Sequence, residues 1–132
     1  MARVTGIGGV FFKARDPKAL SEWCAKHLGF VLESWGGAIL KWPEDIADDG
    51  GLTVWNLAEQ SSTWFAPSES SFMINYRVDD LEALAKDLEA AGIALLKPIE
   101  KHENGKFGWV MDPEGNKIEL WEPMLWDDKN KG

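Results

Sequence analysis

One carboxylate near the end of the chain is predicted to share a strand face with a tryptophan. In the extended segment 117–121 alternate side chains share a face, so Glu119 lies on the same face as Trp121. The preceding extended segment places Phe107 and Trp109 together in the same way. A carboxyl group among apolar rings is a candidate general acid or base, and in its ionised form it can hold a cationic ligand together with tryptophan faces. Glu119 is therefore one candidate for chemistry, with catalysis and binding as alternatives.

Other residues of chemically active types are few. Cys24 and His27 fall on a predicted helix without a partner at helical spacing, which is typical of packing residues. His102 precedes a predicted turn and is a further candidate for the site. The chain has no Gly-x-Gly-x-x-Gly pattern, no Walker-type phosphate loop and no Gly-x-Ser-x-Gly nucleophile motif.

The composition restricts the class of protein. The 132 residues, 45% of them hydrophobic, suffice for one domain with a core of its own. A net charge of −8 disfavours binding to nucleic acid and to anionic membranes, because both require clustered basic residues. The single cysteine cannot form an intramolecular disulfide, and the first residues lack the apolar run of a signal peptide. These features predict a cytoplasmic protein with a small-molecule ligand and no nucleic-acid or membrane partner.

Two helices are predicted, over residues 17–28 and 81–91. Each carries a stripe of apolar residues along one face, as an amphipathic helix does. An aspartate suited to the N-cap precedes each helix, and a glycine suited to the left-handed C′ position follows it. The aspartates are Asp16 and either Asp79 or Asp80, and the glycines are Gly29 and Gly92.

The two helices belong to an internal repeat. Asp16, Ala19 and Leu20 align with Asp80, Ala83 and Leu84 at an offset of 64 residues. A short extended segment precedes each helix and three follow it, at 9–14, 30–34, 38–42 and 52–57 in the first half and at 73–78, 93–102, 106–111 and 117–121 in the second. The pattern predicts one α+β domain over 1–132, built of two tandem βαβββ modules at 4–57 and 72–123 with a linker at 58–71.

The duplicated module and one closing motif resemble a known superfamily. The motif is Asp112-Pro113-Glu114-Gly115-Asn116-Lys117-Ile118-Glu119-Leu120. Together they are similar to the vicinal oxygen chelate superfamily, which includes glyoxalase I, extradiol dioxygenases and bleomycin-resistance proteins. The resemblance implies that the strands curl into an open barrel with the helices outside and a cup on the concave face.

The resemblance also implies where a metal would bind. The superfamily's ligand positions fall at Gly9, Thr53, Met73 and Glu119 in this sequence. A divalent cation needs carboxylate or imidazole donors, and only Glu119 supplies one. We therefore expect no metal cofactor, while an atypical divalent-metal site that includes His102 stays open.

The same resemblance implies which residues line the cup. Alternation along the mapped strands brings Phe11, Trp55, Asn75, Trp109 and Trp121 around Glu119. Asn75 is expected either to orient a ligand by hydrogen bonding or to satisfy backbone groups, and Arg77 either joins the ligand site or neutralises Glu119. The structural alternative for each tryptophan is core or dimer packing.

Two functional hypotheses follow. The first is a glyoxalase- or bleomycin-resistance-like protein that binds a small organic ligand, cationic ligands included, around Glu119 without a metal. The second is an enzyme of the same superfamily, a glyoxalase-like lyase or isomerase or an extradiol-type dioxygenase, with Glu119 as the catalytic residue or with an atypical metal. Met124, Leu125 and Trp126 follow the last strand without an evident partner, and we expect them to cover a neighbour in a homodimer.

Overall fold

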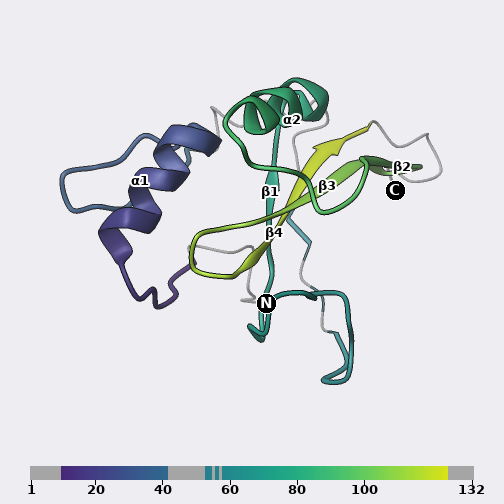
Figure 1. The fold of residues 1–132 in the computed structure, drawn as a ribbon, viewed down its shortest axis with the longest axis horizontal. Coiled ribbons are helices and arrows are strands. Elements are labelled where there is room, and N and C mark those ends of the chain that lie inside the picture. The colour runs from purple at the N-terminus through teal and green to yellow at the C-terminus, as the bar shows by residue number, and fades with distance from the viewer. Residues whose placement is uncertain (1–9, 42–52, 55, 57, 125–132) are drawn as a thin grey trace, which may run out of the picture.

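The computed structural model describes residues 10–41, 53, 54, 56 and 58–124. Its elements are, in order, α1 (Pro17–Leu28), β1 (Ile74–Arg77), α2 (Leu81–Ala90), β2 (Glu100–His102), β3 (Gly105–Met111) and β4 (Lys117–Pro123). The strands form one open mixed sheet in the order β1-β4-β3-β2 (Figure 1). β1 runs parallel to β4, whereas β3 pairs with β4 and with β2 in antiparallel fashion.

Helix α1 begins and ends at the predicted residues. Oδ1 of Asp16 accepts a hydrogen bond from Ala19 N at 3.0 Å, and Pro17 takes the first helical position, where a missing N–H costs nothing. Gly29 closes the helix at φ 75°, a left-handed conformation that favours glycine. The local sequence therefore determines both ends of α1.

Helix α2 follows the same rules. Asp80, not Asp79, is the N-cap, and its Oδ1 accepts from Ala83 N at 3.0 Å. The helix ends at Ala90, one residue before the predicted end, and Gly92 takes φ 82°. These caps fix α2 between β1 and β2.

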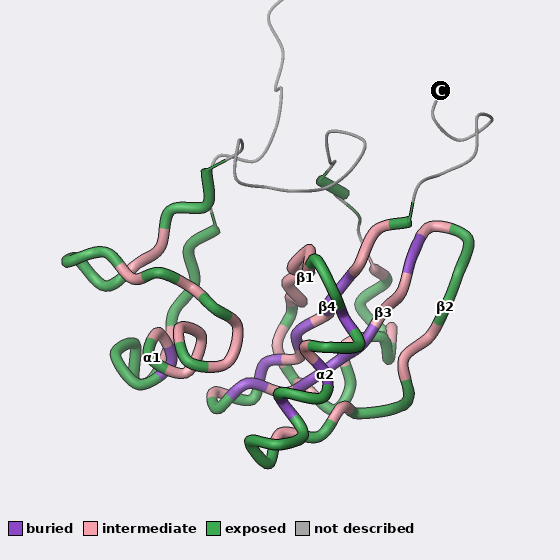
Figure 2. The backbone as a smooth tube through the Cα atoms, turned by 90° about the horizontal axis from the view of Figure 1, so that it is seen from above, coloured by how far each residue is buried: buried purple, intermediate pink, exposed green. Residues whose placement is uncertain are grey.

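The core lies between α2 and one face of the sheet. Figure 2 shows that burial follows α2, β3 and β4. Gly108 on β3 faces α2, because a Cβ at this position would lie 3.5 Å from a methyl group of Leu81. The buried cluster consists of Leu81, Leu88, Val110, Ile118 and Leu120. Side chains at the alternate positions of β3 and β4 therefore point to the opposite face of the sheet.

The second half of the chain has the predicted order of one strand, one helix and three strands. Around α1, the described residues form only an isolated bridge between Leu32 and Ala38 in place of the strands expected at 9–14, 30–34 and 38–42. The strand expected at 52–57 lies largely outside the described residues. The described part of the sheet is thus four-stranded and open.

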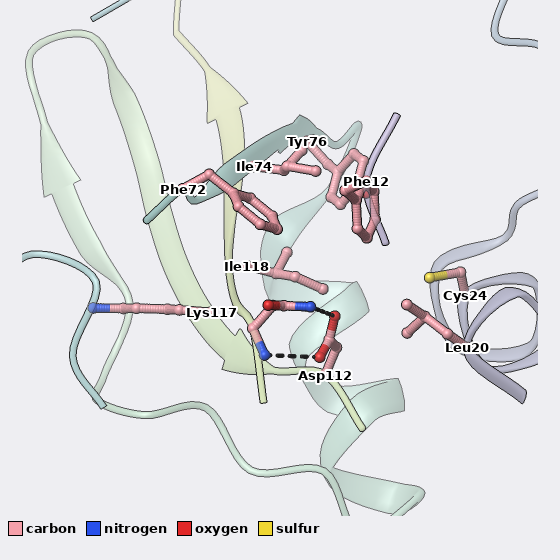
Figure 3. A pocket seen from close by; sticks show the side chains of 10 residues that line it. Phe12, Leu20, Cys24, Phe72, Ile74, Tyr76, Asp112, Lys117 and Ile118 are labelled. Carbon is pink, nitrogen blue, oxygen red and sulfur yellow. Dashed lines mark hydrogen bonds between the residues drawn. The ribbon is translucent and has the colours of Figure 1, made fainter. Parts of the chain in front are cut away.

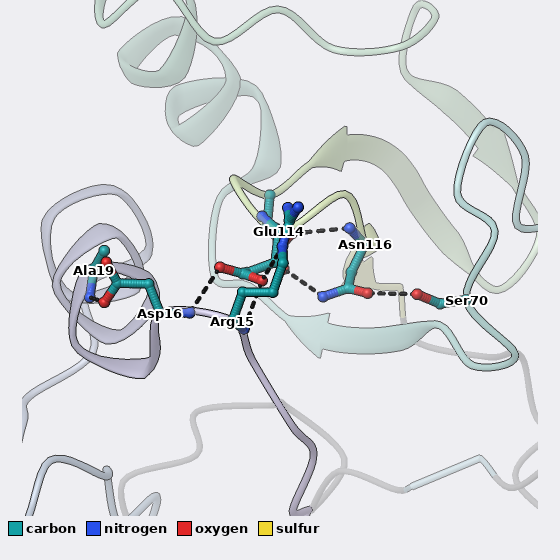
Figure 4. Close-up of polar contacts among 7 residues, drawn as sticks. Arg15, Asp16, Ala19, Ser70, Glu114 and Asn116 are labelled. Carbon is teal, nitrogen blue, oxygen red and sulfur yellow. Dashed lines mark hydrogen bonds and ion pairs between the residues drawn. The ribbon is translucent and has the colours of Figure 1, made fainter.

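The two residues before α1 bind the turn between β3 and β4 through Glu114. Glu114 Oε1 accepts from Arg15 N at 2.8 Å and from Arg15 Nε at 3.1 Å, and Oε2 accepts from Asp16 N at 3.2 Å (Figure 4). These hydrogen bonds from Arg15 hold the pKa of the Glu114 carboxyl below its ordinary value. On the same turn, Asn116 Oδ1 accepts from Ser70 Oγ at 2.6 Å. The turn therefore joins α1 and the segment before β1 to the sheet.

Candidate functional site

The face of the sheet opposite α2 carries the residues on which the sequence analysis centred. Strand register places Asn75, Glu119 and Trp109 in one row across β1, β4 and β3. The next row contains Trp121 and Phe107. We call these five residues (Asn75, Phe107, Trp109, Glu119 and Trp121) the aromatic face. Four of its members come from the two central strands, β3 and β4, which the turn at 112–116 joins in antiparallel register.

Glu119 is held on both sides within its row. Its Oε1 accepts from Asn75 Nδ2 at 2.7 Å, and its Oε2 accepts from Trp109 Nε1 at 2.9 Å. Both oxygens thus act as acceptors, which is the role of an ionised carboxylate. The arrangement fixes the plane of the Trp109 indole relative to the carboxylate.

The three rings of the aromatic face lie nearly parallel. The Phe107 centroid is 6.3 Å from that of Trp109 at an interplanar angle of 16°, and 6.0 Å from that of Trp121 at 11°. Trp121 Nε1 donates to Asn104 O at 3.0 Å, so each indole N–H has a partner. Trp109 and Trp121 are only 9% and 5% exposed, whereas Phe107 is half-buried. The indoles form a fixed floor beside the accessible Phe107 ring.

Two lysines that the sequence analysis missed lie against this floor. Lys97 Nζ is 4.5 Å and Lys117 Nζ is 5.7 Å from the centroid of the Trp109 ring. Lys117 Nζ also donates to Trp64 O at 2.8 Å. Figure 3 shows its side chain running away from Ile118, as the alternation along β4 requires. That alternation was the available signal, because Lys117 lies two residues before Glu119.

The surroundings of Lys117 disfavour its protonated form. Burial is the main cause that lowers its pKa from the ordinary value of 10.5, and the charge of Lys97 adds to it. Glu119 and Glu100 act in the opposite direction. Lys97 itself is paired with Glu100 at 2.6 Å. Charges of both signs therefore surround the Trp109 ring.

Of the residues predicted for the ligand cup, Asn75, Trp109, Glu119 and Trp121 lie together. Arg77 is half-buried and lies in register beside Trp121. Phe11 is 94% exposed and belongs to none of the strands. Trp55 lies outside the described residues.

The residues at the expected metal positions do not fit a divalent ion. Gly9 lies outside the described residues, Thr53 is exposed, and Met73 offers a thioether. Both oxygens of Glu119 already accept hydrogen bonds. Within residues 10–41, 53, 54, 56 and 58–124, no group of three or more His, Cys, Asp or Glu side chains is arranged to hold a metal.

His102, the candidate for an atypical site, has other contacts. Its Nε2 lies 2.9 Å from Glu100 Oε1, and its ring packs edge-on against Phe107 at 5.7 Å. These contacts place it at the margin of the aromatic face.

A second cluster of titratable groups lies between α1 and the sheet. It borders a small pocket lined by Phe12, Leu20, Cys24, Phe72, Ile74, Tyr76, Asp112, Asn116, Lys117 and Ile118 (Figure 3). Burial, with the charge of Asp112 in addition, raises the pKa of Cys24 to about 11. Burial likewise raises the pKa of Tyr76 to about 12. Both groups therefore stay protonated at neutral pH, which suits packing residues.

Neither described helix combines the length and the apolar composition needed to cross a membrane.

Comparisons with known proteins give one family and several similar folds. The model of the glyoxalase-like domain family matches residues 9–121. A search of curated protein sequences gave no match. The chain spans about half the length of three solved structures (47%, 51% and 45%), at TM-scores of 0.38, 0.36 and 0.37.

Other solved structures match along nearly their whole length. TnmS3, an antibiotic binding protein from Streptomyces sp. CB03234, is 17% identical with a TM-score of 0.57, covering 94% of this chain and 100% of TnmS3. A protein of unknown function from Agrobacterium tumefaciens str. C58 is 18% identical with a TM-score of 0.53, covering 89% and 98%. A member of the glyoxalase/bleomycin resistance protein/dioxygenase superfamily from Sphaerobacter thermophilus DSM 20745 is 20% identical with a TM-score of 0.50, covering 92% and 98%. At these identities the likeness concerns the fold.

Proposed function

The chain belongs to the glyoxalase-like domain family, and on that premise we propose that it binds a small planar organic molecule on the aromatic face, around Glu119. The observation that carries this proposal is the set of three nearly parallel rings with one carboxylate hydrogen-bonded to Trp109, the ring at one side of the set. The name of TnmS3, an antibiotic binding protein with a similar fold, supports a binding role. Fold likeness alone does not determine activity, so the residues of the aromatic face are the main support for the proposal.

The rigidity of the floor favours binding. Both indoles are fixed by hydrogen bonds, so they lose little freedom when a ligand arrives. Because Trp109 and Trp121 are buried, we expect a ligand to contact Phe107, Asn75 and Glu119 directly. The indoles then support the ligand from behind.

We further propose that binding requires no metal. A metal-dependent lyase or dioxygenase would need a donor set around Glu119, and the thioether and the neutral hydroxyl at the mapped positions are poor donors for it. Metal analysis of the purified protein tests this part. A stoichiometric, tightly bound divalent ion would overturn it.

Two tandem βαβββ modules, at 4–57 and 72–123, remain our proposal for the whole chain. The support is the aspartate cap shared by α1 and α2 together with the strand, helix and three strands of the second half. An experimental structure without pseudo-twofold symmetry between the halves would contradict it.

The binding proposal is tested by substitution of the carboxylate. Tryptophan fluorescence is followed while catechols, α-keto aldehyde–thiol adducts and basic glycopeptide drugs are titrated into the wild type and Glu119→Gln. We expect the substitution to weaken binding of probes whose hydroxyl groups donate to the carboxylate, the catechols, by about 1.5–3 kcal/mol, the scale of a hydrogen bond to a charged group. Glu89→Gln, exposed on α2, is the matched control and should bind as the wild type does. Identical titration curves for Glu119→Gln and the wild type would defeat the role of Glu119.

A further inference from the structure

The charges beside the Trp109 ring restrict the class of ligand. Lys97 and Lys117 bring two ammonium groups within 4.5 and 5.7 Å of its centroid. The electron-rich ring thus already has cations against it. A cationic ligand at this ring would have to displace them or lie beside them.

The acidic groups nearby are already engaged. Glu100 is paired with Lys97 at 2.6 Å and with His102 at 2.9 Å. The two oxygens of Glu119 accept from Asn75 and Trp109. Among the described residues, Lys117 Nζ donates to a neutral carbonyl, that of Trp64, and forms no ion pair with a carboxylate. Lys117 Nζ therefore has no described carboxylate within ion-pair distance, although the charges of Glu119 and Glu100 act on it.

Aromatic surface lies next to these ammonium groups. The Phe107 ring, which is half-buried, lies 6.3 Å from the Trp109 ring that the two ammonium groups contact. The backbone carbonyl of Trp64, a residue that is 60% exposed, binds Lys117. The Lys97 side chain is 52% exposed, so a molecule from solvent can reach its ammonium group. The surface thus combines the accessible Phe107 ring with two cations against the neighbouring Trp109 ring.

We propose, building on the proposed function, that the ligand is a planar aromatic acid whose anionic group pairs with Lys97 and Lys117 while its ring lies against the exposed aromatic side chains. Ammonium–carboxylate hydrogen bonds are about twice as strong as neutral ones, so the charge of the ligand's substituent should decide its affinity. The cationic ligands that the sequence suggested are then the disfavoured class.

Three probes of the same ring system test the charge preference. Isothermal titration calorimetry compares 2-naphthoate, the neutral 2-naphthamide and the cationic 2-naphthylmethylammonium ion. We expect 2-naphthoate to bind at least about tenfold more tightly than 2-naphthamide, and the ammonium ion most weakly. Equal affinities for the first two, or tightest binding of the ammonium ion, would overturn this inference and leave the proposed function standing. Binding of none of the three at millimolar concentration would count against the proposed function itself.

Substitutions separate ion pairing from a structural role. Lys97→Met and Lys117→Met keep the apolar stems and remove the charges. Each substitution should lower the affinity for 2-naphthoate about tenfold and leave the affinity for 2-naphthamide unchanged. Lys86→Met, exposed on α2, is the control and should change neither. If Lys117→Met lowers the affinity for 2-naphthoate and for 2-naphthamide by the same factor, the lysine only supports the fold and the ion pair is contradicted.

Discussion

At the scale of single residues, Glu119 illustrates how one carboxylate serves two neighbours. Trp109 is a buried donor that cannot change its role, because an indole N–H has no acceptor form. Asn75 is exposed and carries both a donor and an acceptor on its amide. The two partners should therefore respond differently when Glu119 is replaced.

Glu119→Leu and Glu119→Gln separate these contributions to stability. Leucine leaves Trp109 Nε1 buried without an acceptor, so we expect the free energy of unfolding to fall by about 1–3 kcal/mol. Glutamine can turn its oxygen to Trp109 and its amide to Asn75, which rotates to accept, so its cost should stay below about 1 kcal/mol. Urea unfolding measures both. Equal losses would mean that the Trp109 hydrogen bond contributes little.

Cys24 provides a second prediction, on reactivity. With a pKa of about 11 in place of the ordinary 9.0, about one thiol in a thousand is ionised at pH 8, against about one in ten. Iodoacetamide should therefore alkylate Cys24 about a hundredfold more slowly in the folded protein than in urea. Mass spectrometry of timed samples measures the rates. Comparable rates in both states would show that the thiol is not shielded by α1 and the sheet.

The same shift has a consequence for stability. The folded state holds the thiol proton more tightly than the unfolded chain, so the stabilisation is complete below pH 9.0 and is lost as the pH rises towards about 11. Tyr76 acts in the same direction at higher pH, because its pKa rises from 10.0 to about 12. Cys24→Ala should flatten the fall in the free energy of unfolding between pH 9 and 11.

At the scale of elements, Gly105 at the start of β3 is packed closely against the end of β4, next to the aromatic face. Gly105 takes φ 139°, a backbone conformation that residues other than glycine rarely adopt. A Cβ there would also collide with the backbone oxygen of Glu122 and lie 2.6 Å from Trp121 Nε1. The conformation of the turn and the position of the Trp121 indole therefore both require glycine at position 105.

Gly105→Ala is expected to lower the free energy of unfolding by more than about 2 kcal/mol, through backbone strain and the collision together. Gly92→Ala is the matched control, since Gly92 also has a positive φ of 82° but open space around its Cβ position. Its cost should be about 1 kcal/mol. Urea unfolding of both variants measures the difference. A smaller loss for Gly105→Ala than for the control would contradict the close approach of Trp121.

The elements also show which signals in the sequence are local. The bounds of α1 and α2 were predicted to within one residue, because aspartate caps and glycine stops act over a single turn. The strands β3 and β4 were predicted with nearly correct ends, because turn residues such as Asn104 and Gly105 specify hairpins. The strands expected around α1 need partners distant in sequence, and the described part of that half forms one bridge.

The candidate site divides in the same way. Alternation along strands predicted that Glu119 shares a face with Trp121 and that Trp109 shares a face with Phe107. The register of β3 and β4 places both pairs on the same face of the sheet. The hydrogen bond between Glu119 and Asn75 depends on the parallel register of β1 and β4, which no turn encodes. Lys97 was missed because it precedes β2, where no periodicity indicates which surface its side chain reaches.

At the scale of the whole molecule, the family match over residues 9–121 confirms the resemblance to the vicinal oxygen chelate superfamily that the duplicated pattern suggested. The described structure supplies an α+β fold with an open mixed sheet. Its buried side chains concentrate in α2, β3 and β4, while Leu20 is the one buried hydrophobic residue described before residue 58 (Figure 2). The two halves therefore differ in how completely they cover their apolar side chains.

This difference underlies the prediction that the protein forms a homodimer. Large apolar side chains are exposed mainly along the described first half, and Met124 at the end of β4 is 46% exposed. Exposed apolar area of this kind marks surfaces that associate, and a symmetric dimer is the commonest outcome. The exposed residues are Val10, Phe11, Phe12, Val31, Trp35, Ile39, Leu40, Val54, Trp64, Leu96 and Met124.

Light scattering at micromolar concentration should therefore give a mass twice the 14.8 kDa of one chain. Phe11→Ser tests whether the exposed first half is responsible. Because the Phe11 ring is 94% exposed within one chain, its loss should change the free energy of unfolding of a monomer by no more than about 0.5 kcal/mol. Within a dimer that covers this ring, the same substitution removes buried apolar area, so dissociation should begin at a higher protein concentration. Lys86→Met, on the exposed side of α2, should leave the dissociation curve unchanged. A mass near 14.8 kDa for the wild type would contradict the dimer, since the exposed apolar side chains would then face solvent without a second copy to cover them.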